Sequence, residues 1–252
     1  MRADIVTRLR EAGCVFAEDE AAVLISAAQT SAELDAMVGR RVAGLPVEQV
    51  VGWAEFRGVR ITVEPGVFVP RRRTEFLVTH AVALARPGDV IVDLCCGAGA
   101  IAAALCAAVP GIEAHAADID PVAVRCARRN VPGHVYEGDL YEPLPEHLRG
   151  RIAVLTANVP YVPTAEIGLL PAEARVHEPL AALDGGPDGL AVLRRVAREA
   201  PDWLAQGGHL LTETSEGQAL AAAALAGLTG DRLAARVARS AELDAVTIIY
   251  QN

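Results

Sequence analysis

Two acidic residues, each beside an apolar run, could together hold a ligand that contains a nucleoside. Asp93 lies near the end of one run, and the small residues of 95–99 follow it. Gly97 and Gly99 permit backbone conformations and a close approach that a Cβ atom would block. A helix that begins there would offer free N–H groups to a carboxylate or a phosphate. Asp118 follows the next apolar run and is placed to bind ribose hydroxyls, so we expect a nucleoside cofactor at these strand ends.

The small-residue turn alone is compatible with more than one cofactor. Residues 97–102 also fit the G-x-G-x-x-G/A pattern of dinucleotide-binding proteins. A tight strand-to-helix turn without any ligand is another interpretation. Asp93, directly before the turn, favours a cationic or amine-bearing cofactor such as S-adenosylmethionine, because its carboxylate would repel a pyrophosphate.

A second group of residues favours S-adenosylmethionine. Asn158, Val159, Pro160 and Tyr161 follow the apolar run 152–156. This tetrapeptide resembles the N-P-P-Y motif of methyltransferases that modify planar amide or amino nitrogens. An ordinary asparagine turn after a strand is the alternative, and it is disfavoured by the nucleotide-type turn expected in the same sheet.

The residue types suit methyl transfer to a nitrogen whose lone pair is delocalised, which is a poor nucleophile. The side-chain carbonyl of Asn158 and the backbone carbonyl of Val159 can each accept one N–H of a substrate NH₂ group. That would hold the nitrogen in line with the cofactor methyl group. Pro160 would stiffen the turn, and Tyr161 would give a flat face on which the substrate group packs.

The elements that carry these residues alternate between strands and helices from Thr74 onward, which predicts an α/β domain with a mostly parallel sheet. A proline-studded stretch, 158–187, has little regular pattern, and a connection of that length is more often functional than not. The pattern predicts strands at 90–94, 112–117, 152–156 and 208–212, helices at 98–109, after Asp120-Pro121 and at 190–204, and an edge hairpin at 232–239 and 245–250.

The residues before this region predict a different organisation. Residues 1–44 indicate short helices, one of them with a capping box at Thr30 and Glu33. From 47 to 63 the apolar period changes to that of strands, which predicts a hairpin that turns near Arg57-Gly58. We expect this hairpin to connect a small helical domain to the rest.

Composition narrows the function classes. At 252 residues, with 52% hydrophobic and 22% charged residues, the chain can bury a large core, which excludes intrinsic disorder. The net charge of −9 argues against a broad interface with duplex nucleic acid, and Arg71-Arg72-Arg73 is the one obvious basic run.

The five cysteines lack C-x-x-C spacing, which predicts free thiols in a reducing compartment and no metal site. No apolar run approaches the roughly 20 residues of a membrane span. We therefore expect a soluble cytoplasmic protein without a membrane or stable nucleic-acid partner.

Further motifs, in the right order along nearly the whole chain, resemble those of the bacterial protein-(glutamine N5) methyltransferases, the HemK/PrmC-like family. Several independent matches in order are more specific than any one. The motifs are Arg40-Arg41…Gly44-x-Pro46 and Gly52-x-x-Glu55-Phe56 in the linker, 68–75 for F-[IV]-P-R-P-x-T-E, 93–99 for D-L-G-T-G-[ST]-G, 158–161 for N-P-P-Y, and 178–190 for E-P-x-x-A-L-x-G-G-x-D-G-L.

The resemblance implies a fold and its division into domains. The fold class would be α/β, the Rossmann-like sheet of class I S-adenosylmethionine-dependent methyltransferases, with a small N-terminal helical domain and a β-hairpin linker. Residues 1–45 would form the helical domain and help to choose the protein substrate. Residues 46–66 would form the linker, and 67–252 the methyltransferase domain.

The resemblance also implies roles for individual residues. The catalytic residues would be those of the tetrapeptide 158–161. The cofactor would bind beside Asp93 and contact Cys95, Cys96, Gly97, Ala98, Gly99, Asp118, Leu140 and Asn158, with Phe68, Pro70 and Arg71 flanking the pocket and Asp139 next to the adenine.

Three residues depart from the family pattern and bear on substrate identity more than on reaction class. Cys95 replaces the first glycine of the cofactor loop, which we expect only if its φ is negative. Arg72 replaces a proline. Val159 replaces the first proline of N-P-P-Y, and its carbonyl can still accept a hydrogen bond although the turn is less rigid.

The sequence thus predicts methyl transfer from S-adenosylmethionine to the side-chain amide of a glutamine in an exposed loop of a protein. By resemblance, that protein would be a peptide chain release factor or another translation protein. An N6-adenine DNA or RNA methyltransferase is the nearest alternative, and the acidic net charge argues against it. A dinucleotide-dependent dehydrogenase would leave 158–161 unexplained. A methyltransferase-like adaptor without activity is favoured only by the departures at Cys95 and Val159.

Overall fold

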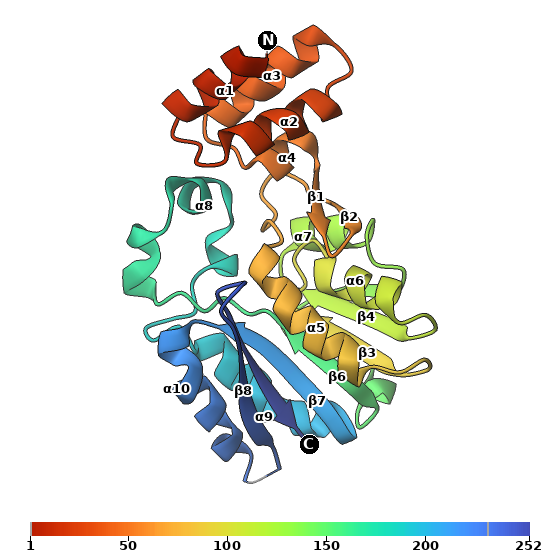
Figure 1. The fold of residues 1–252 in the computed structure, drawn as a ribbon. Coiled ribbons are helices and arrows are strands. Elements are labelled where there is room, and N and C mark those ends of the chain that lie inside the picture. The colour runs from red at the N-terminus through yellow and green to blue at the C-terminus, as the bar shows by residue number, and fades with distance from the viewer. Residues whose placement is uncertain (1, 231) are drawn as a thin grey trace.

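A seven-stranded sheet forms the centre of the larger part of the molecule (Figure 1). The computed structural model describes residues 2–230 and 232–252. The strands are β3 (Val90–Leu94), β4 (Glu113–Asp118), β5 (His134–Glu137), β6 (Ile152–Ala157), β7 (Leu204–Thr214), β8 (Ala234–Ser240) and β9 (Ala245–Gln251). Their order is β5-β4-β3-β6-β7-β9-β8, and β9 pairs antiparallel with β7 and β8 while the other pairs are parallel. The α/β class and the edge hairpin are confirmed.

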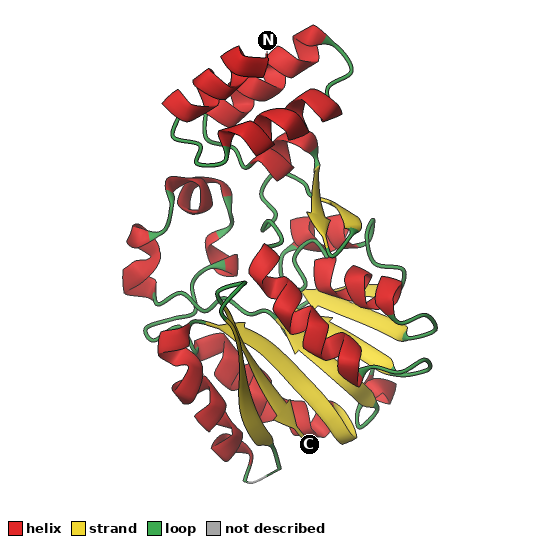
Figure 2. Cartoon of the chain, in the orientation of Figure 1, coloured by secondary structure: helices red, strands yellow, loops and turns green. Residues whose placement is uncertain are grey.

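Helices cover both faces of the sheet and create two separate cores (Figures 1 and 2). Every residue of β3 is buried, as the unbroken apolar run around Asp93 predicts for a central parallel strand. Because neighbouring strand residues point to opposite faces, Ile91 belongs to one core and Val92 to the other. The first core is covered by α5 (Glu75–Leu84), α6 (Ala100–Ala108) and α7 (Pro121–Ala127), and the second by α9 (Ala191–Trp203) and α10 (Ala219–Ala224).

In the described part of the chain, the first four helices pack around a third core of their own. Thr30 caps the third helix, since its hydroxyl accepts a hydrogen bond from the N–H of Glu33 at 3.2 Å, and the Glu33 carboxylate accepts one from Gln29. The predicted capping pair is therefore present. These helices are α1 (Arg2–Glu11), α2 (Ala17–Ala27), α3 (Ser31–Val42) and α4 (Val47–Val51).

A two-stranded hairpin follows the helices, with β1 (Trp53–Phe56) and β2 (Val59–Thr62) paired antiparallel. It turns at Arg57 and Gly58, both with positive φ, as the type I′ hairpin turn requires. The prediction of strands from residue 47 was wrong, because 47–51 forms α4, which ends at Gly52 with a φ of 83°. Valine-rich segments favour strands locally, but here Val50 is buried in the helical core, and this packing stabilises a helix instead.

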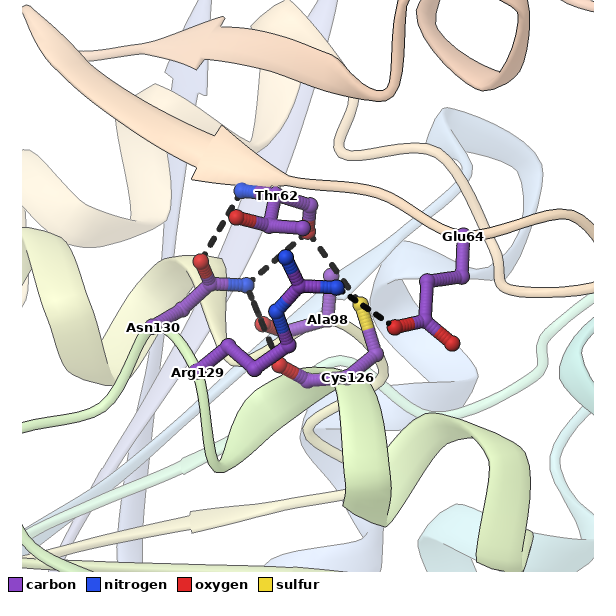
Figure 3. A network of polar contacts seen from close by, with 6 residues as sticks. All are labelled: Thr62, Glu64, Ala98, Cys126, Arg129 and Asn130. Atoms are coloured by element: carbon purple, nitrogen blue, oxygen red, sulfur yellow. Dashed lines mark hydrogen bonds and ion pairs between the residues drawn. The ribbon is translucent and has the colours of Figure 1, made fainter.

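Asn130 ties this hairpin to the sheet domain (Figure 3). Its Nδ2 donates to the carbonyl oxygens of Thr62 at 2.9 Å and Ala98 at 2.8 Å, and its Oδ1 accepts from the N–H of Thr62 at 2.9 Å. The Cys126 thiol also donates to the Thr62 carbonyl, at 3.2 Å. One amide side chain thus joins the end of β2 to the glycine-containing loop that precedes α6.

The stretch 158–187 is not structureless. It contains a short helix, α8 (Ala172–His177), and 3₁₀ turns at Thr164–Leu169 and Leu180–Ala182. In Figure 1 it lies between the end of the sheet and the N-terminal helices. An ion pair of 3.0 Å between Arg41 and Glu173 joins it to those helices. No helix of the described residues is both long enough and apolar enough to cross a membrane.

Candidate active site

A cavity of about 680 Å³ lies where the carboxyl ends of the strands, the stretch 158–187 and the N-terminal helices meet. Most of the residues singled out from the sequence lie on its wall. Those on the wall are Phe68, Pro70, Arg71, Cys95, Cys96, Gly97, Ala98, Asp118, Asn158, Val159, Pro160 and Tyr161, whereas Asp93, Gly99, Asp139 and Leu140 are not among its lining residues.

The loop 95–99 is bent by three residues in the left-handed region. Cys95, Gly97 and Gly99 have φ of 54°, 54° and 77°. The expectation of a negative φ at Cys95 was therefore wrong, because the chain must turn sharply between β3 and α6. A Cβ atom at Gly99 would also collide with the side chain of Val131, so this position requires glycine.

Asp118 at the end of β4 holds this loop in place. Its Oδ2 accepts a hydrogen bond from the N–H of Gly97 at 2.8 Å, and its Oδ1 accepts one from Asp120 at 2.9 Å. Burial raises the pKa of Asp118, and the two backbone N–H groups oppose that rise. Each carboxylate oxygen keeps a second lone pair, so the side chain can bind a hydroxyl in the cavity as well.

Asp93 lies beneath the loop rather than on the cavity wall. It is 1% exposed, and its Oδ1 accepts a hydrogen bond from Thr156 Oγ1 at 2.8 Å. Its Oδ2 has no hydrogen-bond partner among the described residues. Burial raises the pKa of Asp93 to about 7. The carboxyl group therefore carries less than a full charge near neutral pH.

Asp139 and Leu140 have contacts away from the cavity wall. The Asp139 carboxylate pairs with Arg195 at 2.7 Å, and Leu140 is buried in the core that contains α9. Leu140 has a φ of 50°. In this structure neither side chain reaches the wall of the cavity.

The segment 68–75 is joined to a residue far along the chain. Glu178 accepts hydrogen bonds from the N–H of Val69 at 3.1 Å and from Arg71 Nη2 at 2.6 Å. The guanidinium of Arg71 also lies 4.8 Å from the centre of the Phe68 ring. Because the Glu178 side chain is fully buried, this charged contact orders the cavity wall on the side of Phe68.

The backbone of the tetrapeptide 158–161 is fixed by close packing and by a hydrogen bond. Gln218 Nε2 donates to the carbonyl oxygen of Tyr161 at 2.9 Å. A Cβ atom at Gly185 would lie 2.7 Å from the carbonyl oxygen of Pro160, and one at Gly189 would collide with that of Tyr161. Gly185 and Gly189, two of the three glycines of the 178–190 motif, thus allow that segment to pack against the tetrapeptide.

The side chains of the tetrapeptide are oriented by two neighbours. Asn158 Nδ2 donates to Thr74 Oγ1 at 3.4 Å, and the Tyr161 hydroxyl donates to Glu213 Oε1 at 2.9 Å. Sequence reasoning did not identify Glu213. The available signal was an acidic residue near the end of β7, shortly after the apolar pair Leu210-Leu211.

Sequence reasoning also missed the wall that the N-terminal helices supply. Cys14, Phe16, Glu20, Arg41 and Glu48 line this end of the cavity. Arg41 is 7% exposed and bonds Glu20 at 2.6 Å. These residues approach the sheet only through tertiary packing, which no local pattern reveals.

The described residues that line the cavity supply neither an ionised thiol nor a metal centre. Burial raises the pKa of both Cys95 and Cys96, with nearby carboxylates adding to the rise, so the thiols stay protonated. Among the described residues, no group of three or more histidine, cysteine, aspartate or glutamate side chains could hold a metal ion. What the site offers is a set of hydrogen-bond acceptors that can position a ligand nitrogen near a bound nucleoside.

Known proteins resemble this chain in both sequence and fold. Residues 58–166 match the family model described as methyltransferase small domain. A release factor glutamine methyltransferase of Geobacter sulfurreducens is 37% identical over 188 residues, which cover 73% of this chain and 65% of that protein. Another, of Thermodesulfovibrio yellowstonii, is 32% identical over 229 residues, which cover 87% and 81%. The match to the Geobacter protein thus spans slightly less than two thirds of its length.

A relative with a different substrate is equally similar. The 4-amino-L-phenylalanine/4-methylamino-L-phenylalanine methyltransferase of Streptomyces pristinaespiralis is 38% identical over 205 residues, which cover 77% of this chain and 69% of that protein. Among solved structures, a methyltransferase of Pyrococcus furiosus has a TM-score of 0.57 at 16% identity and covers 77% of this chain and 89% of that one. The predicted Rossmann-like methyltransferase fold is confirmed.

Proposed function

This chain belongs to the family of release factor glutamine methyltransferases, and we propose that it transfers a methyl group from S-adenosylmethionine to the side-chain amide nitrogen of a glutamine in a protein. The observation that carries the proposal is the position of Asn158 and Val159 on the wall of the same cavity as Gly97 and Asp118. A nucleoside and a planar nitrogen can therefore be held side by side.

The residues present fit S-adenosylmethionine. The cofactor supplies a methyl group on a sulfonium, which is already activated as a leaving group. Asp118 would bind the ribose hydroxyls, and residues 95–98 would lie against the cofactor. Phe68, Pro70 and Arg71 would close the pocket from the other side. Asp93, Asp139 and Leu140, which do not line the cavity, would support the loop, and Gly99 would permit its turn.

Asn158 and Val159 would position the acceptor nitrogen. The Asn158 side-chain carbonyl and the Val159 backbone carbonyl each accept one N–H of the substrate NH₂ group, which aims its lone pair at the methyl group. Pro160 keeps the turn in shape, and Tyr161 packs against the flat amide. After transfer the nitrogen loses a proton to solvent, so no strong base is needed.

The protein substrate would enter between the N-terminal helices and the stretch 158–187. Residues 1–45 would recognise it, the hairpin region 46–66 would link them to the rest, and 67–252 would carry the reaction. A glutamine in an exposed loop, such as that of a release factor, can insert there without the base flipping that a duplex would need. The protein would act in the cytoplasm, where its five free cysteines stay reduced.

A small aromatic amine is the second candidate substrate. The Streptomyces pristinaespiralis relative is named for an aryl amine, whose NH₂ group would suit the same two carbonyl acceptors. An adenine amino group would suit them too, but the net charge of −9 disfavours nucleic acid.

The test is to incubate the protein with S-adenosylmethionine labelled in its methyl group. Purified release factor, the same factor with its loop glutamine replaced by alanine, 4-amino-L-phenylalanine, and DNA and RNA serve as separate acceptors. We expect label in the first alone, on glutamine after digestion. Label only in the amine or in nucleic acid would reject the protein substrate. With a cell lysate as a further acceptor, label on glutamine in another protein but not in release factors would retain the reaction and reject the named substrate.

A further inference from the structure

The side-chain amide of Gln218 makes four hydrogen bonds and joins three segments of the chain. Its Nε2 donates to the carbonyl oxygens of Tyr161 and Asp188, both at 2.9 Å. Its Oε1 accepts from Ser215 Oγ at 2.7 Å and from Thr214 Oγ1 at 3.3 Å. Both hydrogens and both lone pairs of the amide are therefore used. One side chain thus connects the tetrapeptide 158–161, the 178–190 motif and the end of β7.

These partners allow the Gln218 amide one orientation. A backbone carbonyl has no hydrogen to donate, so the carbonyl oxygens of Tyr161 and Asp188 require the NH₂ end of the amide. The two hydroxyl groups can both donate to the oxygen end. A reversed amide would place its oxygen against two carbonyl oxygens and lose both of those hydrogen bonds.

A glycine makes room for this contact. A Cβ atom at Gly189 would collide with Gln218 Nε2 and with the carbonyl oxygen of Tyr161. Gly189 also has a φ of 74°, which a residue with a Cβ atom adopts only at a cost. The hydrogen bond from Gln218 to Tyr161 therefore needs both the amide and the glycine.

Tyr161 is held at two points by residues at or just after the end of β7. Its hydroxyl donates to Glu213 Oε1 at 2.9 Å, and its backbone carbonyl accepts the bond from Gln218. Gln218 lies in the 3₁₀ turn Glu216–Gln218 that follows the strand. Because the ring lies between its two bonded ends, it has little freedom to tilt. Tyr161 lines the cavity, so its ring presents a fixed face to a ligand there.

The tetrapeptide needs this support because it has one proline where the related N-P-P-Y motif has two. Val159 stands at the first proline position. Rotation about φ is possible in valine, whereas the ring of proline fixes that angle. The N–H of Val159 donates to no backbone carbonyl of the described residues, so no such hydrogen bond restrains the chain at this point.

We propose that Gln218 is a positioning residue that holds the backbone of Tyr161, while Glu213 holds its hydroxyl, and that this contact supplies rigidity that a proline at position 159 would otherwise give. The inference rests on the proposed function, because a flat acceptor group needs the ring of Tyr161 in one orientation. Gln218 does not line the cavity of about 680 Å³, so it would act on turnover through Tyr161.

The first test replaces the donor without a large change in size. In Gln218→Glu a carboxylate faces the two carbonyl oxygens and cannot donate to them. We expect kcat to fall roughly 10-fold to 100-fold, with the affinity for S-adenosylhomocysteine within about twofold of wild type. Asn252→Asp is the matched control, because Asn252 Nδ2 also donates to two backbone carbonyl oxygens, at the far end of the sheet. It should lower the melting temperature and leave kcat unchanged, and an equal loss of kcat there would overturn the inference.

A rescue experiment separates positioning from a general loss of stability. Val159→Pro fixes φ at position 159 and breaks no backbone hydrogen bond to a described carbonyl. We expect it to raise kcat by a larger factor in Gln218→Glu than in the wild-type background, because the two residues share one task. The same factor in both backgrounds would contradict the proposal.

A further measurement does not depend on turnover. In protein labelled with 3-fluorotyrosine, the four tyrosines can be followed by ¹⁹F resonances, and Tyr161→Phe identifies the resonance of Tyr161. We expect Gln218→Glu to shift or broaden it and Asn252→Asp to leave it in place. A wild-type protein without methyl transfer to any acceptor would reject the proposed function and leave this resonance to decide whether Gln218 fixes the ring. Normal kcat in Gln218→Glu, or an unchanged Tyr161 resonance, would overturn the inference.

Discussion

The carboxylate of Asp118 accepts a hydrogen bond of 2.8 Å from the backbone N–H of Gly97, 21 residues earlier in the chain. The residue expected to bind ribose thus also shapes the loop on which the cofactor would lie. Since an acceptor that is already fixed in place loses little freedom when a ligand arrives, the loop and its acid form one prepared surface.

Replacing Asp118 by alanine tests that double role. We expect Asp118→Ala to weaken S-adenosylhomocysteine binding by about 1–3 kcal/mol, because a charged hydrogen-bond partner is lost. Calorimetric titration measures this directly. Asp89→Ala is the control, since it removes a carboxylate that accepts a backbone N–H, from Arg86, but does not line the cavity. Unchanged affinity in Asp118→Ala would exclude Asp118 from ribose binding.

The parts of the site that follow from local pattern were predictable from the sequence. Asp118 is the last residue of β4, and Asn158 directly follows β6. The carboxyl ends of parallel strands lie at the same edge of a sheet. Their common position on the cavity wall therefore needed only the strand assignments. The contacts of Arg71 with Glu178, 107 residues apart, and of Tyr161 with Glu213, 52 apart, depend on tertiary packing and have no local signature.

Two sequence expectations failed because tertiary structure outweighed local preference. A valine-rich segment at 47–51 forms a helix because its apolar residues complete the helical core. Cys95 takes a left-handed conformation although this costs a residue with a Cβ atom roughly 1–2 kcal/mol. The sharp turn between β3 and α6 imposes that conformation.

The cost at Cys95 can be measured with two variants. Cys95→Gly and Cys95→Ala both remove the thiol and differ only by a Cβ atom. At a φ of 54° we expect the glycine variant to be more stable than the alanine variant by about 1 kcal/mol, the reverse of the order in a helix. Urea denaturation followed by circular dichroism gives the difference. Greater stability of Cys95→Ala would show that Cys95 is not held in the left-handed region.

The buried carboxyl of Asp93 predicts a pH dependence of stability. Its pKa is about 7 in the folded protein and near 4 in the unfolded chain, so the folded state holds a proton that the unfolded state has released. This stabilisation is complete below pH 4 and is lost as the pH rises to about 7. We expect Asp93→Asn, which is neutral throughout, to lose less unfolding free energy between pH 5 and pH 8, by about 1–3 kcal/mol. Parallel stability curves for the two proteins would contradict the assignment.

The hydrogen bonds of Asn130 predict that its replacement lowers the free energy of unfolding more than replacement of the neighbouring Arg129. Asn130→Ala leaves the carbonyl oxygens of Thr62 and Ala98 without their donor, and we expect a loss of about 1–3 kcal/mol in the free energy of unfolding. Arg129→Ala removes only an exposed ion pair with Glu64 and should cost less than about 1 kcal/mol. Figure 3 shows both residues on the same short segment. Equal losses in the two variants would mean that Asn130 does not join the hairpin to the loop.

Replacing Asn158 by alanine tests whether its side chain positions the acceptor nitrogen without contributing to cofactor binding. Asn158→Ala removes one of the two carbonyl oxygens expected to hold the substrate nitrogen, while the ribose acceptor Asp118 and the loop 95–99 stay in place. We therefore expect turnover of the confirmed protein substrate to fall about 10²-fold or more, with S-adenosylhomocysteine affinity within about twofold of wild type. Asn252→Ala, a change of the same type at the far end of the sheet, should leave turnover intact. Near-normal turnover in Asn158→Ala would mean that the Asn158 side chain does not hold the substrate nitrogen. The reason is that an amide nitrogen is a poor nucleophile, so losing one of its two hydrogen-bond acceptors should slow the reaction.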